Sequence, residues 1–198
     1  MREVVLRISG VTFGSRSNGP GARTVIHFQG CSIGCPGCFN KKTWNSKGGD
    51  FWHVPDLARH ALSKGQDITI SGGEPTEQWD ELISFLKCVR LIAPERTIVM
   101  YTGVESEKLI WSGKMKELEK YVDLLIAGPY VSSQKVDGPP LISSYNQERI
   151  FISDRIKPED LEECPRVELT YLGGGEVRIM GFPETDDRGR IKTKREGV

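Results

Sequence analysis

Three closely spaced cysteines are the most reactive group of side chains in the sequence. Cys31, Cys35 and Cys38 follow a predicted strand, with three and then two residues between them. This spacing lets one short loop bring three sulfurs around a single compact centre, and the intervening glycines remove bulk where the backbone must bend. Clustered thiols outside a disulfide framework are typical of metal ligands. The loop therefore predicts a metal centre.

Two kinds of metal centre compete for three thiolates. Structural zinc takes four ligands, commonly from paired CxxC elements, and this loop contains one such element. Packing roles are favoured over a fourth-ligand role for the remaining candidates: Cys88, Cys164, His27 and His53. An iron–sulfur cluster is usually held by four cysteines, so three leave one iron open to a substrate. The spacing favours a 4Fe-4S cluster, with zinc as the alternative.

A second motif follows the next predicted strand. Residues 67–70, DITI, run straight into SGGEP at 71–75, and a helical pattern comes next. Paired glycines at the carboxyl end of a strand let a ligand approach the backbone, and Glu74 offers a carboxylate to an ammonium group. A plain turn between strand and helix is the alternative interpretation of this motif.

Together the two motifs resemble the radical S-adenosylmethionine (radical SAM) superfamily. The spacing of Cys31, Cys35 and Cys38 is similar to its cluster loop, and SGGEP follows at roughly one βαβ unit. Gly37 stands where the general pattern has an aromatic residue. CPGC followed by an aromatic residue and asparagine, at 35–40, resembles one branch, the small glycyl-radical activases typified by the activating proteins of anaerobic (class III) ribonucleotide reductase.

Further segments are similar to the same branch. NGPGAR at 18–23 precedes the cluster strand, and MYTGVE at 100–105 resembles the YTG strand end of the activases. VDLLIAGPY at 122–130 and SYNQ at 144–147 are similar to their Gly-Pro and SSNQ signatures, with tyrosine in place of one serine. Each segment alone could be a strand end or a turn. The resemblance spans residues 3–152, most of the chain.

The resemblance implies a defined chemistry. Cys31, Cys35 and Cys38 would hold the cluster, whose open iron would chelate the methionine part of S-adenosylmethionine. Electron transfer would then cleave the sulfonium bond and release a 5′-deoxyadenosyl radical. The resemblance also assigns a second set of residues to binding of the cofactor. Gly37 and Phe39 would lie beside the adenine, and the other members of the set are Gly72, Gly73, Glu74 and Thr102. No further catalytic residue is expected, because the cofactor carries the chemistry.

The resemblance also implies partners. The radical acceptor would be a glycine of a glycyl-radical enzyme such as anaerobic ribonucleotide reductase, and a reducing electron donor protein would supply the electron. Two alternatives remain open. One is a radical SAM enzyme that modifies a peptide or a small molecule, and the other is a non-catalytic iron–sulfur or zinc binding module.

The composition is that of an ordinary globular protein. The 198 residues are 37% hydrophobic, and 27 Lys and Arg balance 27 Asp and Glu, so no net positive charge favours a nucleic acid. The N-terminus lacks the apolar stretch of a signal peptide, and no segment has the length of a membrane span. The five cysteines do not read as a secreted disulfide framework. We therefore expect a cytoplasmic protein without nucleic-acid or membrane partners.

Alternating strand and helix patterns must position these motifs. Apolar, β-branched runs predict strands at the following places: Val4–Ile8, Thr24–Phe28, Asp67–Ser71, Thr97–Thr102 and Val122–Ala127. Helical spacing predicts helices over 57–62 and 79–89 and a less regular one over 105–121. Alternation favours a mostly parallel sheet. Because a complete eight-fold barrel takes about 250 residues, the predicted fold class is α/β, an incomplete βα barrel.

The predicted division of the chain has three parts. Residues 1–152 form the radical SAM core. Residues 153–183 form a C-terminal extension, in which apolar alternation on both sides of GGG at 173–175 predicts a β-hairpin. The polar segment 184–198 is expected to be disordered.

Overall fold

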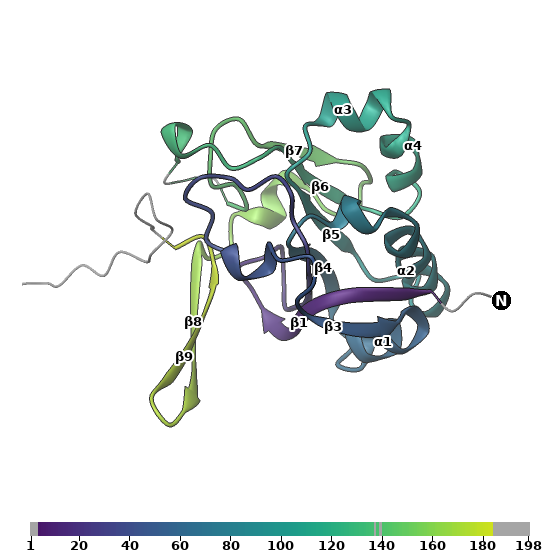
Figure 1. Cartoon of the computed structure of the whole chain (residues 1–198), viewed down its shortest axis with the longest axis horizontal. Helices are drawn as coiled ribbons and strands as arrows, with labels where there is room; N and C mark the ends of the chain where they lie inside the picture. The colour runs from purple at the N-terminus through teal and green to yellow at the C-terminus, as the bar shows by residue number, and fades with distance from the viewer. Residues whose placement is uncertain (1–3, 137, 139, 184–198) are drawn as a thin grey trace, which may run out of the picture.

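One mixed β-sheet carries the two motifs (Figure 1). The computed structural model describes residues 4–136, 138 and 140–183, so the tail at 184–198 lies outside the described residues. Within them, seven strands form one sheet in the order β3-β1-β2-β4-β5-β6-β7. Their bounds are β1 Val5–Ser15, β2 Arg23–Phe28, β3 Asp50–His53, β4 Asp67–Gly72, β5 Ile98–Thr102, β6 Leu124–Ala127 and β7 Glu148–Phe151.

The centre of the sheet is parallel and its edges are antiparallel. Strands β2, β4, β5 and β6 pair in parallel, whereas β1 pairs antiparallel with β2 and β3, and β7 pairs antiparallel with β6. The predicted α/β fold with parallel core strands is confirmed. Strands β3 and β7 were not predicted, because each is a four-residue edge strand with no fully buried residue, too short to show a repeated apolar pattern.

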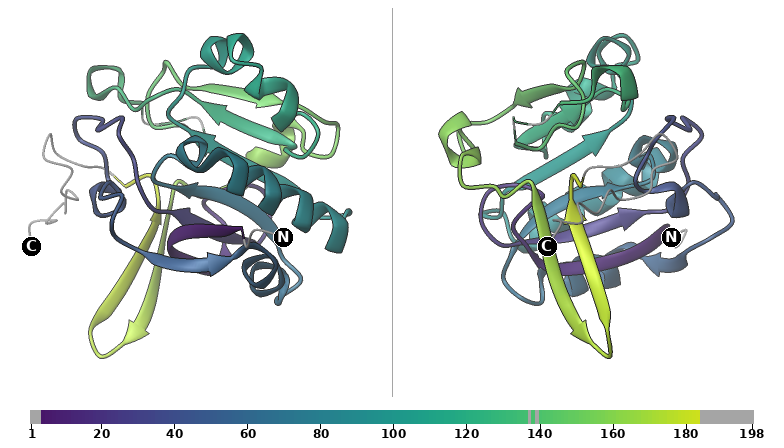
Figure 2. Two further views of the ribbon diagram at one scale, coloured as in Figure 1. Left: turned by 45° about the vertical axis from the view of Figure 1, so that its right-hand side comes forward. Right: turned by 90° about the vertical axis from the view of Figure 1, so that its left-hand side faces the viewer.

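The helices lie on one face of the sheet (Figure 2). They are α1 Val54–Leu62, α2 Trp79–Ile92, α3 Ser106–Trp111 and α4 Lys114–Leu118. The predicted helix over 105–121 is two short helices, because Gly113 between them has a φ of 74°. That left-handed conformation ends a helix and is readily adopted by glycine.

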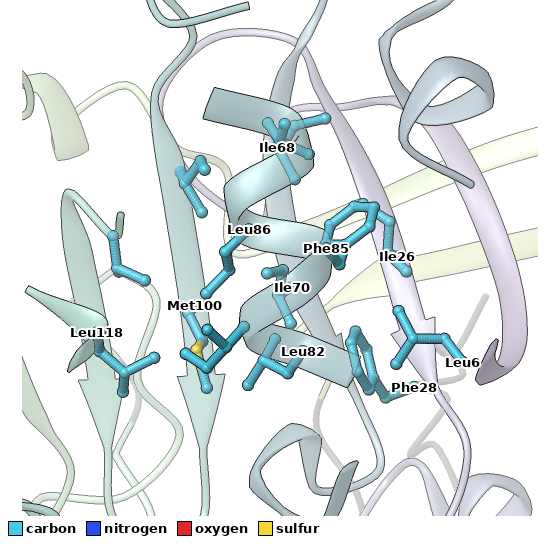
Figure 3. Close-up of a cluster of buried hydrophobic side chains, with 14 of the residues drawn as sticks. Leu6, Ile26, Phe28, Ile68, Ile70, Leu82, Phe85, Leu86, Met100 and Leu118 are labelled. Carbon is cyan, nitrogen blue, oxygen red and sulfur yellow. The ribbon is translucent and has the colours of Figure 1, made fainter. Parts of the chain in front are cut away.

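The main core lies between these helices and the sheet (Figure 3). Alternate strand residues such as Ile26, Ile70 and Met100 meet the apolar face of α2, and all are fully buried. This is the amphipathic face that the spacing of Leu82 and Leu86 predicts. Period-two strands and a period-3.6 helix thus bury the same apolar layer.

A second core covers the opposite face of the sheet. Val99, Leu124 and Ile126 point there and pack against residues from two later segments. These segments are the long connection at 128–147 and the C-terminal extension, which contribute Val136, Leu141, Ile142, Ile156 and Leu161. The extension therefore shares a core with the sheet.

The C-terminal hairpin projects away from the sheet (Figures 1 and 2). It consists of β8 Val167–Gly173 and β9 Glu176–Gly181, paired antiparallel around the predicted glycine turn. Only its base contacts the rest of the described chain, where Gly181 lies against Ser17 and Phe182 against Tyr101. Among the described residues, the helices are all too short or too polar to cross a membrane.

Candidate functional site

The cysteine loop begins where β2 ends, at the carboxyl edge of the parallel strands. Gly30 turns the chain with a φ of 99°, and its amide donates to the carbonyl of Thr43 at 2.7 Å. The Cys31 amide donates to the Trp44 carbonyl at 3.1 Å. The loop is therefore anchored at its start by the segment that follows it.

All three loop cysteines are free thiols of intermediate burial. The Cys38 amide donates to the Cys35 carbonyl at 3.1 Å, which forms a tight turn between these two. Burial raises the pKa of the Cys31 and Cys35 thiols above their usual range. Positive charge from a bound metal is the general means by which such thiols lose their protons.

The donor set suits a cuboidal cluster. Three partly buried cysteine thiols lie on one loop, and cysteine thiolates are the usual ligands of such a cluster. In the described part of the chain, no group of three His, Cys, Asp or Glu side chains is placed to hold a single metal ion.

The second motif is hydrogen-bonded directly to the cysteine loop. The Gly73 amide donates to the Phe28 carbonyl at 2.8 Å, and the Glu74 amide donates to the Gly30 carbonyl at 2.8 Å. A Cβ on Gly73 would lie 2.1 Å from the Gly30 oxygen, and one on Gly72 would lie 2.4 Å from the Phe28 nitrogen. In the structure, the lack of side chains on Gly72 and Gly73 lets their backbone approach the backbone of Phe28 and Gly30 closely.

Glu74 connects this edge to β5. Its side chain is 2% exposed, and its Oε1 accepts from the Thr76 amide, the Thr76 hydroxyl and the Thr102 hydroxyl at 2.9, 2.7 and 2.8 Å. Its Oε2 accepts from the Gly103 amide at 2.7 Å. Oε2 thus accepts one hydrogen bond, against three at Oε1, and a carboxylate oxygen with one donor can accept a further one.

The end of β5 also contacts the cysteine loop itself. A Cβ on Gly103 would lie 2.5 Å from Cδ1 of Ile33, so Ile33 packs directly on this glycine. The predicted site segments around Cys31, Gly73 and Thr102 therefore meet at one edge of the sheet.

Two polar residues after the glycine motif support the loop and were missed in the sequence. Glu77 Oε1 accepts from the amide and the hydroxyl of Ser32 at 2.7 and 2.6 Å. In the Gln78 side chain, Oε1 accepts from the backbone amide of Arg7 at 2.7 Å, and Nε2 donates to the backbone carbonyls of Arg7 and Gln29 at 2.9 and 3.0 Å. In the sequence, only their position soon after SGGEP marks these two residues. In the structure they lie in a 3-10 turn at Pro75–Gln78.

Gly37 and Phe39, the predicted adenine contacts, border a small cavity beside Cys38. Its volume is about 140 Å³, and the opposite wall comes from later parts of the chain. These contributors are Tyr130, Lys135, Ser143, Arg166, Gly181, Phe182 and Pro183. The C-terminal extension thus helps to enclose the space next to the third cysteine.

Two of the other matching segments brace the fold. Arg23, in NGPGAR, is fully buried at the opposite end of β2, where it donates to the Thr69 hydroxyl at 2.7 Å and to the Ile68 carbonyl at 2.6 Å. Burial lowers the pKa of Arg23 to about 10. Gln147, in SYNQ, donates to the Gly128 carbonyl at 3.1 Å. These contacts join strands and loops away from the thiols.

Cys88 and Cys164 lie outside the site. Each is partly buried and packs against a hydrophobic cluster, Cys88 against the core under α2 and Cys164 against the second core. His53 lies on edge strand β3 and is exposed. His27 lies on the sheet face opposite the helices, and its Nε2 is 3.2 Å from the Thr12 hydroxyl.

Comparison with known proteins agrees with this arrangement. Residues 17–150 match a family model described as a 4Fe-4S single cluster domain. An anaerobic ribonucleoside-triphosphate reductase-activating protein of Enterobacteria phage T4 is 38% identical over 120 residues, which cover 57% of this chain and 74% of that protein. The protein of the same name from Escherichia coli K12 is 28% identical over 63% of this chain and 84% of its own length.

A second kind of activating enzyme matches a shorter share. The pyruvate formate-lyase-activating enzyme of Clostridium pasteurianum is 34% identical over 116 residues, covering 55% of this chain and 46% of that enzyme. Residues 17–150, which match the family model, contain both the cysteine loop and the glycine motif. The chain therefore belongs to the 4Fe-4S single cluster domain family, as a radical SAM enzyme of the glycyl-radical-activating type.

Proposed function

We propose that this protein cleaves S-adenosylmethionine reductively and generates a glycyl radical on a partner enzyme such as anaerobic ribonucleotide reductase. The observation that carries the proposal is the direct hydrogen bonding of the glycine motif to the cysteine loop, from the Glu74 amide to the Gly30 carbonyl at 2.8 Å. This contact fixes a carboxylate and a turn of backbone beside three thiols. The names of the matched relatives support the choice of partner.

The three thiols and the other residues at this edge of the sheet have different roles. Cys31, Cys35 and Cys38 would hold the 4Fe-4S cluster and would leave one iron open to the methionine part of the cofactor. The bound cluster would supply the electron for reductive cleavage of the sulfonium bond, which gives the 5′-deoxyadenosyl radical. No acid–base residue is required for that step, because the cofactor carries the reaction.

Glu74 and its neighbours bind the methionine moiety. Oε2 of Glu74 has one hydrogen-bond donor, the Gly103 amide, so it can accept a bond from the methionine ammonium. Gly72 and Gly73 keep the backbone free of side chains at this point, and Thr102 holds the carboxylate in place from β5 at 2.8 Å. A buried, pre-oriented carboxylate needs little reorganisation when it binds a cation.

Gly37 and Phe39 bind the adenine. Both border the cavity beside Cys38, and an aromatic ring provides an apolar face on which a base can stack. A radical intermediate requires water to be kept away, and the C-terminal extension helps to enclose the space beside Cys38. A reducing electron donor protein and a cytoplasmic, reducing environment complete the proposal.

Anaerobic reconstitution tests the cofactor chemistry. We expect a brown 4Fe-4S protein that forms 5′-deoxyadenosine from S-adenosylmethionine when a reductant is added. The triple variant with Cys31→Ala, Cys35→Ala and Cys38→Ala should lose the cluster and the product, whereas Cys88→Ala should keep both. Tight zinc without iron, or turnover by the triple variant, would contradict the site assignment.

The radical acceptor requires a separate test. The reduced protein and S-adenosylmethionine are incubated with the class III ribonucleotide reductase encoded in the same genome, and electron paramagnetic resonance is recorded. A doublet that disappears when the acceptor glycine is replaced by alanine supports the proposed partner. Formation of 5′-deoxyadenosine without any protein radical would remove that partner and leave the cofactor chemistry standing.

A further inference from the structure

A larger cavity adjoins the cysteine loop on the sheet face opposite the helices. It has a volume of about 480 Å³, within the range of small-molecule and peptide side-chain pockets. Its walls come from β1, His27 of β2, Ser71 at the end of β4, Phe39 and Asn40 after the third cysteine, and residues 178–181 of the hairpin. A molecule in this cavity would lie beside the proposed cluster.

The cavity is electropositive. Lys42 and Arg178 line it, and both side chains are exposed, which places them at its mouth. Its described lining contains no Asp or Glu, and within the described residues neither cation forms an ion pair with a carboxylate. Glu168 on β8 is held elsewhere, by the Arg16 amide at 2.9 Å and the Ser15 hydroxyl at 3.1 Å.

His27 lies inside the cavity, and its pKa is affected by the two cations. Burial, followed by the charges of Lys42 and Arg178, lowers the pKa of His27 to about 4. The imidazole is therefore neutral near pH 7 and acts as a polar group rather than a third cation. Other uncharged polar side chains complete the lining: Ser9, Thr12, Asn18, Asn40, Thr43 and Ser71.

We propose that this cavity binds a carboxylate, with Arg178 and Lys42 as its ligands. The inference rests on the proposed function, because Phe39 and Asn40 belong both to this cavity and to the cysteine loop. A guanidinium binds a carboxylate through two parallel hydrogen bonds, which suits Arg178 to this role. The carboxylate is that of an acidic residue near the target glycine, because the methionine carboxylate of the cofactor is assigned to the open iron and both cations are exposed at the mouth of the cavity.

Arg178 lies in the hairpin, beyond residues 17–150 that match the family model. The matched region supplies Lys42 and part of the uncharged wall, and β1 supplies Ser9–Thr12. The extension adds the second cation. The hairpin base closes a site that the core alone leaves open on this side.

A binding measurement tests the site without turnover. The chain has three histidines, so imidazole resonances are few, and the pKa of His27 can be followed in the full-length protein purified anaerobically. N-acetylglycine should raise that pKa, because its carboxylate offsets the two cations, whereas the neutral N-acetylglycinamide should not. Arg178→Gln should abolish the response, Arg178→Lys should restore part of it, and Arg16→Gln should leave it intact.

Kinetics then test whether the acceptor supplies the carboxylate. Formation of 5′-deoxyadenosine is measured against S-adenosylmethionine, and deuterium transfer is measured from α-deuterated glycyl peptides that contain glutamate or glutamine. In Arg178→Gln we expect the KM of the glutamate peptide to increase about tenfold, because one charge-assisted hydrogen bond is lost. The KM values of the glutamine peptide and of S-adenosylmethionine should not change, and an increase for S-adenosylmethionine alone would contradict the proposal.

Two further results would overturn the inference. One is a His27 pKa that responds equally to N-acetylglycine and N-acetylglycinamide. The other is an Arg178→Gln variant in which every KM equals that of wild type while 5′-deoxyadenosine still forms. The second result refutes the carboxylate site and leaves the proposed function intact. Absence of 5′-deoxyadenosine in wild type refutes the function, while the binding measurement still decides the site.

Discussion

At the scale of single residues, Glu74 joins elements that are far apart in the chain. Its carboxylate accepts four hydrogen bonds, from Thr76, Thr102 and Gly103, and its own amide donates to Gly30 at the start of the cysteine loop. Such a buried charge is stable only when it is satisfied by donors. The residue therefore orders the edge of the sheet before any ligand binds.

Replacing Glu74 by glutamine should destabilise the protein. Glu74→Gln keeps the size, but its NH2 group then faces a donor, the Thr102 hydroxyl or the Gly103 amide, and a buried donor without an acceptor costs about 1–3 kcal/mol. Urea unfolding measures this loss. Glu107→Gln on exposed α3 is the matched control and should unfold like wild type. Equal midpoints for both variants would show that the four hydrogen bonds contribute nothing to stability.

His27 should make stability depend on pH in the acid range. Its folded pKa of about 4 lies below the unperturbed 6.5, so between these values the unfolded chain binds more protons than the folded one. Stability is then full above the unfolded pKa and falls as pH drops toward 4, by about 2 kcal/mol at pH 5. His27→Gln should flatten this part of the curve in thermal unfolding of the metal-free protein.

Exposed His53 provides the comparison for that measurement. His53→Gln changes the same side chain on an edge strand and should retain the wild-type pH dependence. If His27→Gln instead loses stability between pH 7 and pH 5 as steeply as wild type, another group causes the acid sensitivity.

At the scale of elements, the site depends on two backbone segments in contact. The turn after β4 and the turn after β2 are hydrogen-bonded through Gly73 and Glu74, and parallel register places His27 opposite Ser71 just before both turns. Carboxyl ends of neighbouring parallel strands necessarily meet at one edge. The sheet therefore brings the cysteine loop and the glycine motif together.

A methyl group at Gly73 should separate these segments. Gly73→Ala places its Cβ 2.1 Å from the Gly30 carbonyl oxygen, and because that oxygen is backbone, the cysteine loop itself must move. We expect lower iron and sulfide content after reconstitution and a stability loss of about 1–3 kcal/mol. Gly138→Ala meets nothing within 4 Å and should behave as wild type. Full cluster loading of Gly73→Ala would contradict the coupling.

At the scale of the whole molecule, the C-terminal extension is tied to the sheet. Leu161 is 1% exposed and packs in the second core with strand residues Val99 and Leu124. The projecting hairpin differs, since Leu169 is 67% exposed. One part of the extension therefore carries folding stability, and the other presents surface.

Two leucine substitutions should separate these roles. Leu161→Ala should lower the free energy of unfolding by about 2–5 kcal/mol, as expected for a core leucine, within a single cooperative transition. Leu169→Ala should change it by less than about 0.5 kcal/mol. Calorimetry on both variants checks the difference. A separate low-temperature transition in Leu161→Ala would mean that the extension unfolds independently of the sheet.

Sequence periodicity was sufficient for the elements that bury apolar faces. The four parallel strands and the helix at Trp79–Ile92 each carry a regular apolar pattern, and the hairpin follows from alternation around three glycines. Edge strands β3 and β7 have four residues each and no fully buried residue, so their apolar residues are too few to form a periodic pattern. Gly113 divides the third helix through a backbone conformation that the surrounding apolar spacing does not encode.

The sequence by itself determined which thiols can share one loop, because the spacing of Cys31, Cys35 and Cys38 is local; that these thiols bind a cluster stays a prediction. The sequence also determined that a glycine motif ends the next strand. Only the tertiary structure decided what those glycines meet, namely the backbone at Phe28 and Gly30. It alone placed Glu77 and Arg178 beside the loop, because contacts between distant segments depend on how the chain packs and leave no periodic signal in the sequence.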